Sequence, residues 1–173
     1  MSEFSAPETS TASELIAKPT LAILLKDPVL LLAFGFGSGL SPKAPGTAGS
    51  LVALALMSLL SLLPGWAFFL ILVVASGLGV LICSHADRRL AGHDHSGIVW
   101  DEFVGLWIAV ASVPATWGWW LAGFALFRCL DIFKPWPISV IDRKMTNGFG
   151  IMLDDILAGV GAWAILMIVM WLL

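Results

Sequence analysis

Long apolar runs set the strongest limit on what this chain can fold into. They cover residues 48–63, 66–83, 103–127 and 156–173. Charged residues make up only 12% of the sequence, whereas a typical soluble domain has about 25%. A helix that spans a bilayer needs about 17–25 apolar residues, so the second and last runs are long enough and the first is at the short limit. The sequence therefore predicts an all-α fold, a polytopic bundle of membrane helices.

The third run, residues 103–127, could be one crossing or a hairpin, and the distribution of positive charge separates the two. A single crossing would put the loops 84–102 and 128–155, which both contain Lys or Arg, on opposite sides. Lys and Arg gather on the cytoplasmic side of membrane proteins. A turn at residues 113–120, around Pro114, places all nine Lys and Arg residues on one side. The charge pattern thus favours a re-entrant segment or hairpin, with arms of about 11 residues that are too short to span.

Other breaks in composition divide the remaining chain. Pro64 and Gly65 separate the first two runs, which predicts an antiparallel helical hairpin there. Residues 1–28 begin with a Ser/Thr-rich stretch and predict a flexible cytoplasmic tail, followed by one membrane-embedded domain over residues 29–173. The net charge of −3 argues against nucleic-acid binding. The two cysteines lie in or beside apolar runs and are expected in the core rather than in a disulfide.

Acidic residues occur where an apolar chain would not be expected to keep them. Asp101–Glu102 in WDEFVG and Asp154–Asp155 in LDDILAG precede apolar runs, and Asp131 lies in FRCLDIFKPWP. Helix capping would explain one acidic residue at each helix start, but it explains adjacent pairs poorly. The predicted topology brings all five acids to the cytoplasmic end of the bundle, where their hard oxygens suit Mg²⁺. The predicted metal ligands are Asp101, Glu102, Asp131, Asp154 and Asp155, meeting at a divalent ion.

Two basic residues accompany Asp131 at helical spacing. Arg128, Asp131 and Lys134 recur every three residues before two prolines end the helix, so their side chains share one helix face. An ordinary surface ion-pair ladder is one interpretation. In the functional interpretation, Arg128 and Lys134 bind phosphate oxygens while Asp131 binds the metal. Arg143, in the next short stretch, is a candidate for a second phosphate contact.

The glycine-rich stretch GFGSGLSPKAPGTAGS, residues 35–50, precedes a helix expected to start at Thr47. Glycines let backbone N–H groups turn toward an anion, and a helix N-terminus favours negative charge. Gly37, Gly39, Gly46 and Thr47 are therefore candidate phosphate-binding residues. A purely structural turn at the membrane surface is the alternative.

The rest of the sequence narrows the chemistry. The three histidines, all between residues 85 and 95, fit no strong zinc pattern. The cysteine and aspartyl-phosphate loops of other phosphatases are missing. A metal-activated water is therefore the simplest nucleophile, and attack by one of the aspartates is the alternative.

Four motifs, taken together, resemble the bacterial phosphatidylglycerophosphatase A family. They are GFGSGLSPKAPGTAGSL, HDHSGIVWDEFVGLWIA, FRCLDIFKPWPISVIDR and GIMLDDILAGV, in this order, within residues 29–162. The resemblance implies a multi-pass, Mg²⁺-dependent enzyme of the bacterial inner membrane, with its active site facing the cytoplasm. It implies hydrolysis of phosphatidylglycerophosphate to phosphatidylglycerol and inorganic phosphate, with no protein partner. The catalytic positions that it implies are Asp101, Glu102, Arg128, Asp131, Lys134, Asp154 and Asp155.

Two other functions remain open from the residues alone. One is a phosphatase of a different lipid phosphate, because the sequence does not rank headgroups. The other is a cation transporter or channel lined by acidic residues, which would distribute its acids through the depth of the bilayer.

Overall fold

The computed structural model describes residues 15–90, 95–140, 145 and 148–173. Helices are its main elements, and no strand occurs among the described residues, where a single isolated β-bridge joins Ile16 to Leu90. The helices are α1 (Leu21–Leu24), α2 (Pro28–Ala33), the 3₁₀ segment η1 (Gly35–Leu40), α3 (Pro45–Leu60), α4 (Gly65–Arg89), α5 (Trp100–Ala109), α6 (Trp117–Phe133) and α8 (Gly148–Leu172). The predicted all-α class is confirmed.

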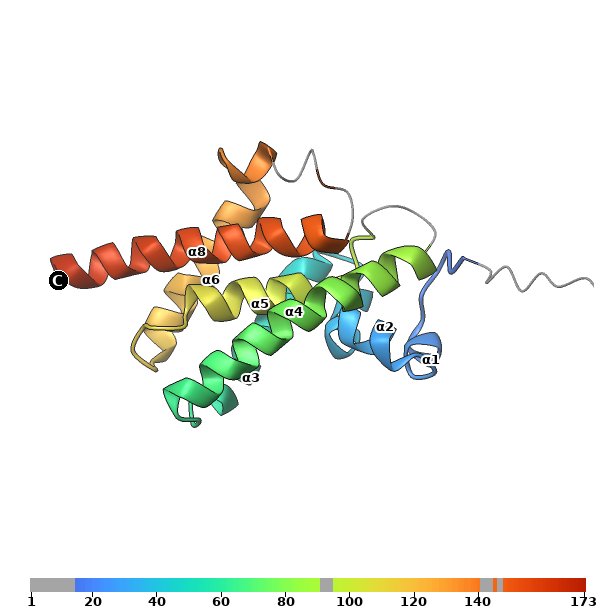
Figure 1. Cartoon of the computed structure of the whole chain (residues 1–173), viewed down its shortest axis with the longest axis horizontal. Coiled ribbons are helices and arrows are strands. Elements are labelled where there is room, and N and C mark those ends of the chain that lie inside the picture. Colours follow the sequence, from blue (N-terminus) through green and yellow to red (C-terminus); the bar gives the residue numbers. More distant parts are fainter. Residues whose placement is uncertain (1–14, 91–94, 141–144, 146–147) are drawn as a thin grey trace, which may run out of the picture.

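The short helix α5 occupies the centre of the bundle. It packs against α3, α4, α6 and α8 (Figure 1). After its acidic first turn it is apolar on nearly every side, and Phe103, Val104 and Leu106 are fully buried. A helix that is apolar all round is stable only when its neighbours cover it. This central position places Asp101 and Glu102 among the ends of the surrounding helices.

Two glycines let the backbones of α5 and α8 approach closely. A Cβ atom on Gly159 would meet the backbone carbonyl oxygen of Gly105, and one on Gly105 would meet the carbonyl oxygen of Asp155 at 2.7 Å. Gly105 follows Asp101 by four residues, and Gly159 follows Asp155 by four, which is about one helical turn in each case. The crossing therefore holds the acidic pairs of the two helices near each other.

The run 103–127 forms two helices joined by a turn, which confirms the predicted hairpin. The turn lies at residues 110–116, because α5 ends at Ala109 and α6 begins at Trp117. The expected turn at 113–120 was thus placed too late. Trp120, expected near the tip, is instead a buried residue of α6. As a result α6 has 17 residues, longer than the arm that the sequence suggested.

The turn at Pro64 is where the sequence predicts it, but the predicted antiparallel hairpin is not a closely packed pair, because α3 and α4 each pack against α5 instead. One further helix boundary differs from the sequence prediction. The last helix, α8, begins at Gly148 rather than at residue 156. Asp154 and Asp155 therefore lie in the second turn of α8, and helix capping cannot account for them.

Residues 15–28, assigned from the sequence to the tail, pack on the body of the protein. Leu24 is fully buried, and the Asp27 side chain caps α2 by accepting hydrogen bonds from backbone N–H groups of its first turn. Asp27 Oδ2 also lies 3.0 Å from His85 Nε2 on α4. This part of the predicted tail is structured, and residues 1–14 lie outside the described residues.

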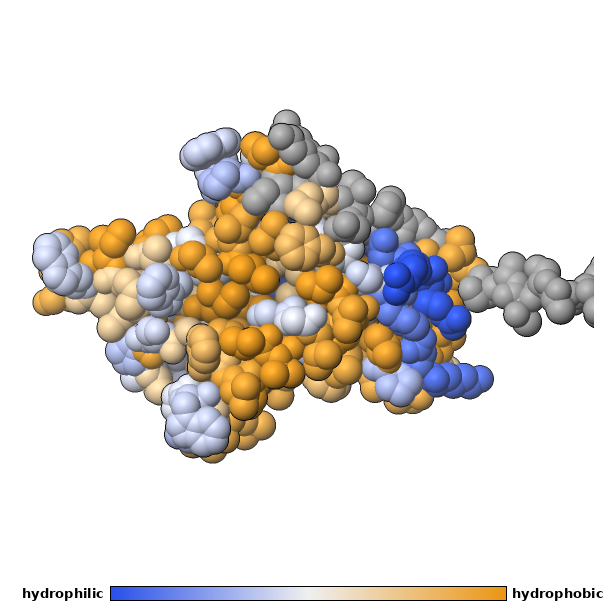
Figure 2. Space-filling model, in the orientation of Figure 1, coloured by the Kyte–Doolittle hydropathy of each residue, from blue (hydrophilic) through white to orange (hydrophobic). Residues whose placement is uncertain are grey.

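Two helices, α4 and α8, are candidate membrane spans by length and composition. Each has 25 residues, and only 22% and 28% of their most apolar stretches are buried. The space-filling view shows apolar side chains over most of the body, while hydrophilic residues gather at the end that carries α1, α2 and the C-terminus of α4 (Figure 2). A core helix of a soluble protein would be mostly covered, and these two are not.

Candidate active site

A pocket of about 390 Å³ lies where α3, α5 and α8 begin and α6 ends. All seven residues predicted to be catalytic line it, so the structure brings together three segments that are far apart in sequence. The lining residues are Ala44, Pro45, Gly46, Ser96, Ile98, Asp101, Glu102, Arg128, Asp131, Lys134, Met145, Gly150, Ile151, Asp154 and Asp155.

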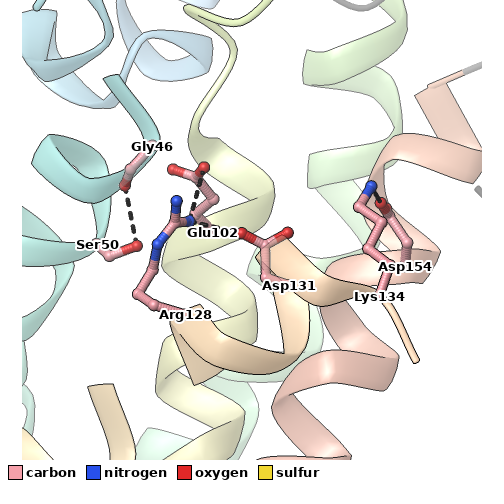
Figure 3. A network of polar contacts seen from close by, with 7 residues as sticks. All are labelled: Gly46, Ser50, Glu102, Arg128, Asp131, Lys134 and Asp154. Carbon is pink, nitrogen blue, oxygen red and sulfur yellow. Dashed lines mark hydrogen bonds and ion pairs between the residues drawn. The ribbon is translucent and has the colours of Figure 1, made fainter. Parts of the chain in front are cut away.

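Arg128 links two of the carboxylates. Its Nη1 atom lies 3.1 Å from Glu102 Oε1 on α5 and 2.7 Å from Asp131 Oδ2 on its own helix (Figure 3). The side chains of all three residues are largely buried, with 13–14% exposed. Arg128 Nε is also buried and has no hydrogen-bond partner. The guanidinium group is thus fixed in the pocket, and its Nε–H remains available to donate a hydrogen bond.

Lys134 ends α6 and turns its side chain toward α8. It adopts a left-handed conformation, with φ of 41°, and its backbone N–H bonds the carbonyl oxygen of Leu130 at 2.8 Å. Its Nζ atom lies 2.5 Å from Asp154 Oδ2 (Figure 3). The helix end that the prolines predicted therefore has a role in the site, because it directs the second cation across the pocket.

Two carboxylate oxygens of the first turn of α5 have no hydrogen-bond partner. They are Asp101 Oδ1 and Glu102 Oε2, and both atoms are buried. Buried polar atoms without a partner are rare in native proteins, and many of those that occur lie where a water or an ion binds. Asp155, on α8, is buried as well. The pocket therefore concentrates acidic oxygens in a place that is poorly hydrated.

The five acids share one pocket, but they do not form one ligand shell. No three of the described His, Cys, Asp and Glu side chains are placed so that they could hold a metal ion together. Arg128 contacts both Glu102 and Asp131, and Lys134 contacts Asp154, so cations occupy oxygens of three of the acids. That all five acids hold one divalent ion therefore stays a prediction.

The glycine-rich stretch is only partly at the site. Gly46 lines the pocket, whereas Gly37, Gly39 and Thr47 are not among its lining residues. Gly37 has a φ of 98°, which favours glycine, and Gly39 packs closely against the backbone of Gly97. These two glycines are explained by the turn itself, which was the structural alternative.

The helix after this stretch starts earlier than predicted. α3 begins at Pro45 instead of Thr47, because proline is well suited to the first helical position. Arg143, the candidate for a second phosphate contact, lies outside the described residues, as does His93. His95 is described, and its Nδ1 accepts a hydrogen bond from the backbone N–H of Gly97 at 3.0 Å.

Sequence reasoning missed some residues of the pocket wall. Ser96 and Met145 come from loops, and no periodicity predicts where a loop will pack. The glycine crossing did leave a signal, because a glycine follows each acidic pair by about one turn. That pattern predicts a close approach of two helices.

Comparisons with known proteins fit the class of protein that the fold and the site define. That class is an apolar helical protein with a pocket of acidic and basic side chains at its polar end. The family model described as phosphatidylglycerophosphatase A matches residues 31–170. No solved structure matches the chain.

Three relatives cover most of the chain. The phosphatidylglycerophosphatase A of Escherichia coli is 47% identical over 137 residues, which are 79% of this chain and 80% of that protein. The phosphatidylglycerophosphatase A of Haemophilus influenzae is 49% identical over 146 residues, 83% of this chain and 90% of that one. A protein of Bacteroides thetaiotaomicron with the provisional name of phosphatidylinositol-3-phosphatase is 39% identical over 155 residues, 83% of this chain and 94% of its own. The chain belongs to the phosphatidylglycerophosphatase A family.

Proposed function

We propose that this chain is a membrane phosphatase that uses Mg²⁺ to hydrolyse phosphatidylglycerophosphate to phosphatidylglycerol and inorganic phosphate. The observation that carries the proposal is one pocket that holds five carboxylates, Arg128 and Lys134 at the polar end of apolar helices, in a chain of this family. A lipid phosphomonoester has the matching form, with a charged end and an apolar end.

The residues of the pocket suit Mg²⁺. The ion prefers carboxylate oxygens and is usually held by one or two of them, with water and substrate phosphate completing its shell. Asp101 and Glu102 offer one buried, unpartnered oxygen each, and Asp131, Asp154 and Asp155 are within the same pocket. Five acids face two cations, so a phosphate dianion would meet net repulsion unless a cation compensated it.

The reaction is a displacement at phosphorus. A water oxygen forms a bond to phosphorus while the bond from phosphorus to the glycerol oxygen breaks. The water gives up one proton as its oxygen joins the phosphate and the glycerol oxygen gains one, so the products are an alcohol and hydrogen phosphate. Bound Mg²⁺ would neutralise phosphate charge and lower the pKa of a coordinated water. Arg128, with its unpartnered Nε, donates to phosphate oxygens as negative charge shifts among them.

The other side chains hold the reacting groups in place. Glu102 and Asp131 position Arg128 through the contacts at 3.1 and 2.7 Å. Lys134 exchanges its contact with Asp154 for a phosphate oxygen, at little cost in charge because one anionic partner replaces another. Gly46 leaves the space in which the Glu102–Arg128 pair fits.

The same end of the protein is proposed to face the cytoplasm of a bacterial inner membrane. The described basic residues that flank the candidate spans lie where α4 ends and α6 ends, as expected for a cytoplasmic face. The turns at the other end of α3, α4, α5 and α6 contain no Lys or Arg between residues 61–64 or 110–116. α4 and α8 would then cross the bilayer, and their exposed apolar side chains would face lipid.

The alternative functions are less well supported. The Bacteroides relative is named for a different lipid phosphate, so a second headgroup is a real rival. A channel would need acids along its length, whereas the five acids here line a single pocket at one end.

Phosphate release from synthetic lipids tests the proposal. The purified protein is expected to release phosphate from phosphatidylglycerophosphate with Mg²⁺, to stop with EDTA, and to recover when Mg²⁺ is restored. Asp131→Asn is expected to lower the rate at least a hundredfold, because it removes a negative oxygen without changing core volume. Faster release of phosphate from phosphatidate or a phosphoinositide would reassign the substrate. Full activity in EDTA would show that the enzyme needs no metal ion.

A further inference from the structure

The segment that ends α6 directs its side chains in two opposite ways. Lys134 lines the pocket, whereas its neighbours Phe133 and Trp136 are 80% and 81% exposed. Ile132 is exposed as well. We call Ile132, Phe133 and Trp136 the aromatic arm. In Figure 1 the chain after α6 projects sideways from the bundle.

The exposure of the arm is fixed by the structure on both sides. The Lys134–Asp154 contact ties it to α8. After Trp136, the buried Ile138 anchors the chain in the core, and its N–H bonds the carbonyl oxygen of Pro135 at 2.8 Å. The aromatic side chains are thus held outward between two anchors, unlike those of a fraying terminus.

A second exposed aromatic residue borders the pocket from another helix. Phe149, in the first turn of α8, is exposed, and the two residues that follow it, Gly150 and Ile151, line the pocket. Apolar surface therefore adjoins the charged pocket on α6 and on α8. Exposed apolar side chains beside a polar site are typical of a surface that binds an apolar partner.

We propose that the aromatic arm, together with Phe149 on α8, binds the acyl chains of the lipid whose phosphate occupies the pocket. This inference rests on the proposed function. Lys134 and Phe133 are adjacent in the chain, so the end of α6 presents a cation to the pocket and an apolar ring outside it. Trp136 suits the same boundary, because tryptophan is enriched where water meets lipid.

Lipid is a better occupant than a second copy of the chain for one reason. The arm is next in sequence to Lys134, which lines a pocket whose proposed ligand already has acyl chains. A dimer formed through the arm would compete with these chains for the same apolar side chains.

The test compares one headgroup on two chain lengths. Phe133→Ser combined with Trp136→Ser is assayed on long-chain phosphatidylglycerophosphate in mixed micelles and on the dibutanoyl form in solution. For the long-chain lipid we expect KM to rise about tenfold or more with kcat unchanged, since the burial of two aromatic side chains is lost. For the short-chain form we expect less than a twofold change. Phe133→Leu with Trp136→Phe should restore long-chain binding.

The matched control is Trp66→Ser, which removes an equally exposed tryptophan at the start of α4. This variant should leave kcat and KM unchanged for both substrates. Equal losses on both substrates, or no loss on either, would overturn the inference. Conversion of a wild-type dimer to a monomer by the double variant would also overturn it, by assigning the arm to a second copy.

A second readout does not depend on turnover. A photoactivatable acyl chain on the phosphomonoester lipid should label residues 132–136 more strongly than the same chain on a lipid without the phosphate, relative to labelling of α4. Equal labelling by the two lipids would contradict the inference. Wild-type protein that labels in this way but releases phosphate from neither chain length would refute the proposed function and leave the acyl-chain site standing.

Discussion

At the scale of single residues, Gly46 is the position where the pocket allows no side chain. A Cβ atom there would meet Glu102 Oε1 and would lie 3.1 Å from Arg128 Nη2. Both atoms belong to the ion pair that fixes the guanidinium group. The first turn of α3 thus packs directly against the Glu102–Arg128 pair and limits where its side chains can lie.

Gly46→Ala should therefore damage catalysis more than folding. The added methyl displaces Glu102 and Arg128, and we expect kcat to fall about a hundredfold, as is typical of a misplacement near 1 Å. Steady-state phosphate release measures this. The control is Gly77→Ala in α4, where nothing lies within 4 Å of the added Cβ, and helix propensity predicts a gain of about 0.5–1 kcal/mol. Full activity of the Gly46→Ala variant would show that catalysis does not depend on the position of the Glu102–Arg128 pair.

Asp27 is a second residue whose environment makes a specific prediction. Burial alone would raise the pKa of this carboxyl group, but the hydrogen bond with His85 and those from the backbone N–H groups of Leu30 and Val29 outweigh it, so the pKa lies below its ordinary value of 3.8. A carboxylate with a lower pKa in the folded state stabilises the protein above the unfolded pKa, and this stability is lost as the pH falls through the folded-state value.

Asp27→Asn separates the charge from the cap, because asparagine also caps helices well. At pH 7 we expect the variant to melt about 2–4 °C below the wild type, the shift that a loss of about 1 kcal/mol produces in a chain of this size. Near pH 3, below the ordinary value of 3.8, the difference between the two melting temperatures should be smaller. Thermal unfolding in detergent at both pH values measures this, and a gap of the same size at pH 3 would contradict it.

At the scale of elements, the sequence predicts the helices better than their ends. The apolar runs and Pro64 correctly predicted α3 and α4, and positive charge identified the hairpin of α5 and α6. The predicted boundaries were wrong where polar residues belong to a helix. Because Asp154 and Asp155 are acidic, the apolar run did not include the first two turns of α8. Residues 15–28 were assigned to the tail together with the Ser/Thr-rich stretch that precedes them, yet Leu24 is buried by tertiary packing that local composition does not encode.

For the site, residue types could be predicted and pairings could not. All seven predicted catalytic residues reach one pocket because charge is costly elsewhere in an apolar bundle. Which acid each cation contacts depends on how the helices pack. One part of that packing is the close approach of α5 and α8 at Gly105 and Gly159, which is seen only when the two backbones are placed together.

Gly159→Ala tests whether this crossing positions the acids. The new Cβ would meet the backbone of Gly105, which cannot move aside as a side chain can. We expect the fold to lose about 1–3 kcal/mol, as in other overpacked cores, and phosphate release to fall with it. The control on the same helix is Gly161→Ala, whose Cβ meets only the flexible Leu130 side chain, at 3.0 Å. Equal behaviour of the two variants in thermal melts and assays would reject the crossing as the cause.

At the scale of the whole molecule, the proposed orientation puts the pocket and both far turns on opposite sides of a bilayer. Positions at the two ends are exposed, which makes them accessible to labels: Lys43 at the pocket end, and Gly65 and Thr116 at the far end. The protein has two cysteines and both are free. Cys83 is buried as expected, whereas Cys129 is exposed on α6 although the sequence placed it in the core. A cysteine-free background is therefore within reach.

Single cysteines at these three positions should report opposite sides. In intact cells, a maleimide that cannot cross the inner membrane should label Gly65→Cys and Thr116→Cys but not Lys43→Cys. Lysis should make Lys43→Cys reactive, which serves as the internal control. Labelling of Lys43→Cys in intact cells would reverse the orientation and place the pocket outside.

The glycine contact between α5 and α8 has a mechanical consequence. One partner, α8, is long enough to cross the membrane, while the other is a short central helix that cannot. Any change of bilayer thickness that tilts the long helix would pivot it about that contact and shift Asp154 and Asp155 relative to Asp101. The lipids of the surrounding membrane would then change the activity of the enzyme through the tilt of α8, without a lipid binding in the pocket.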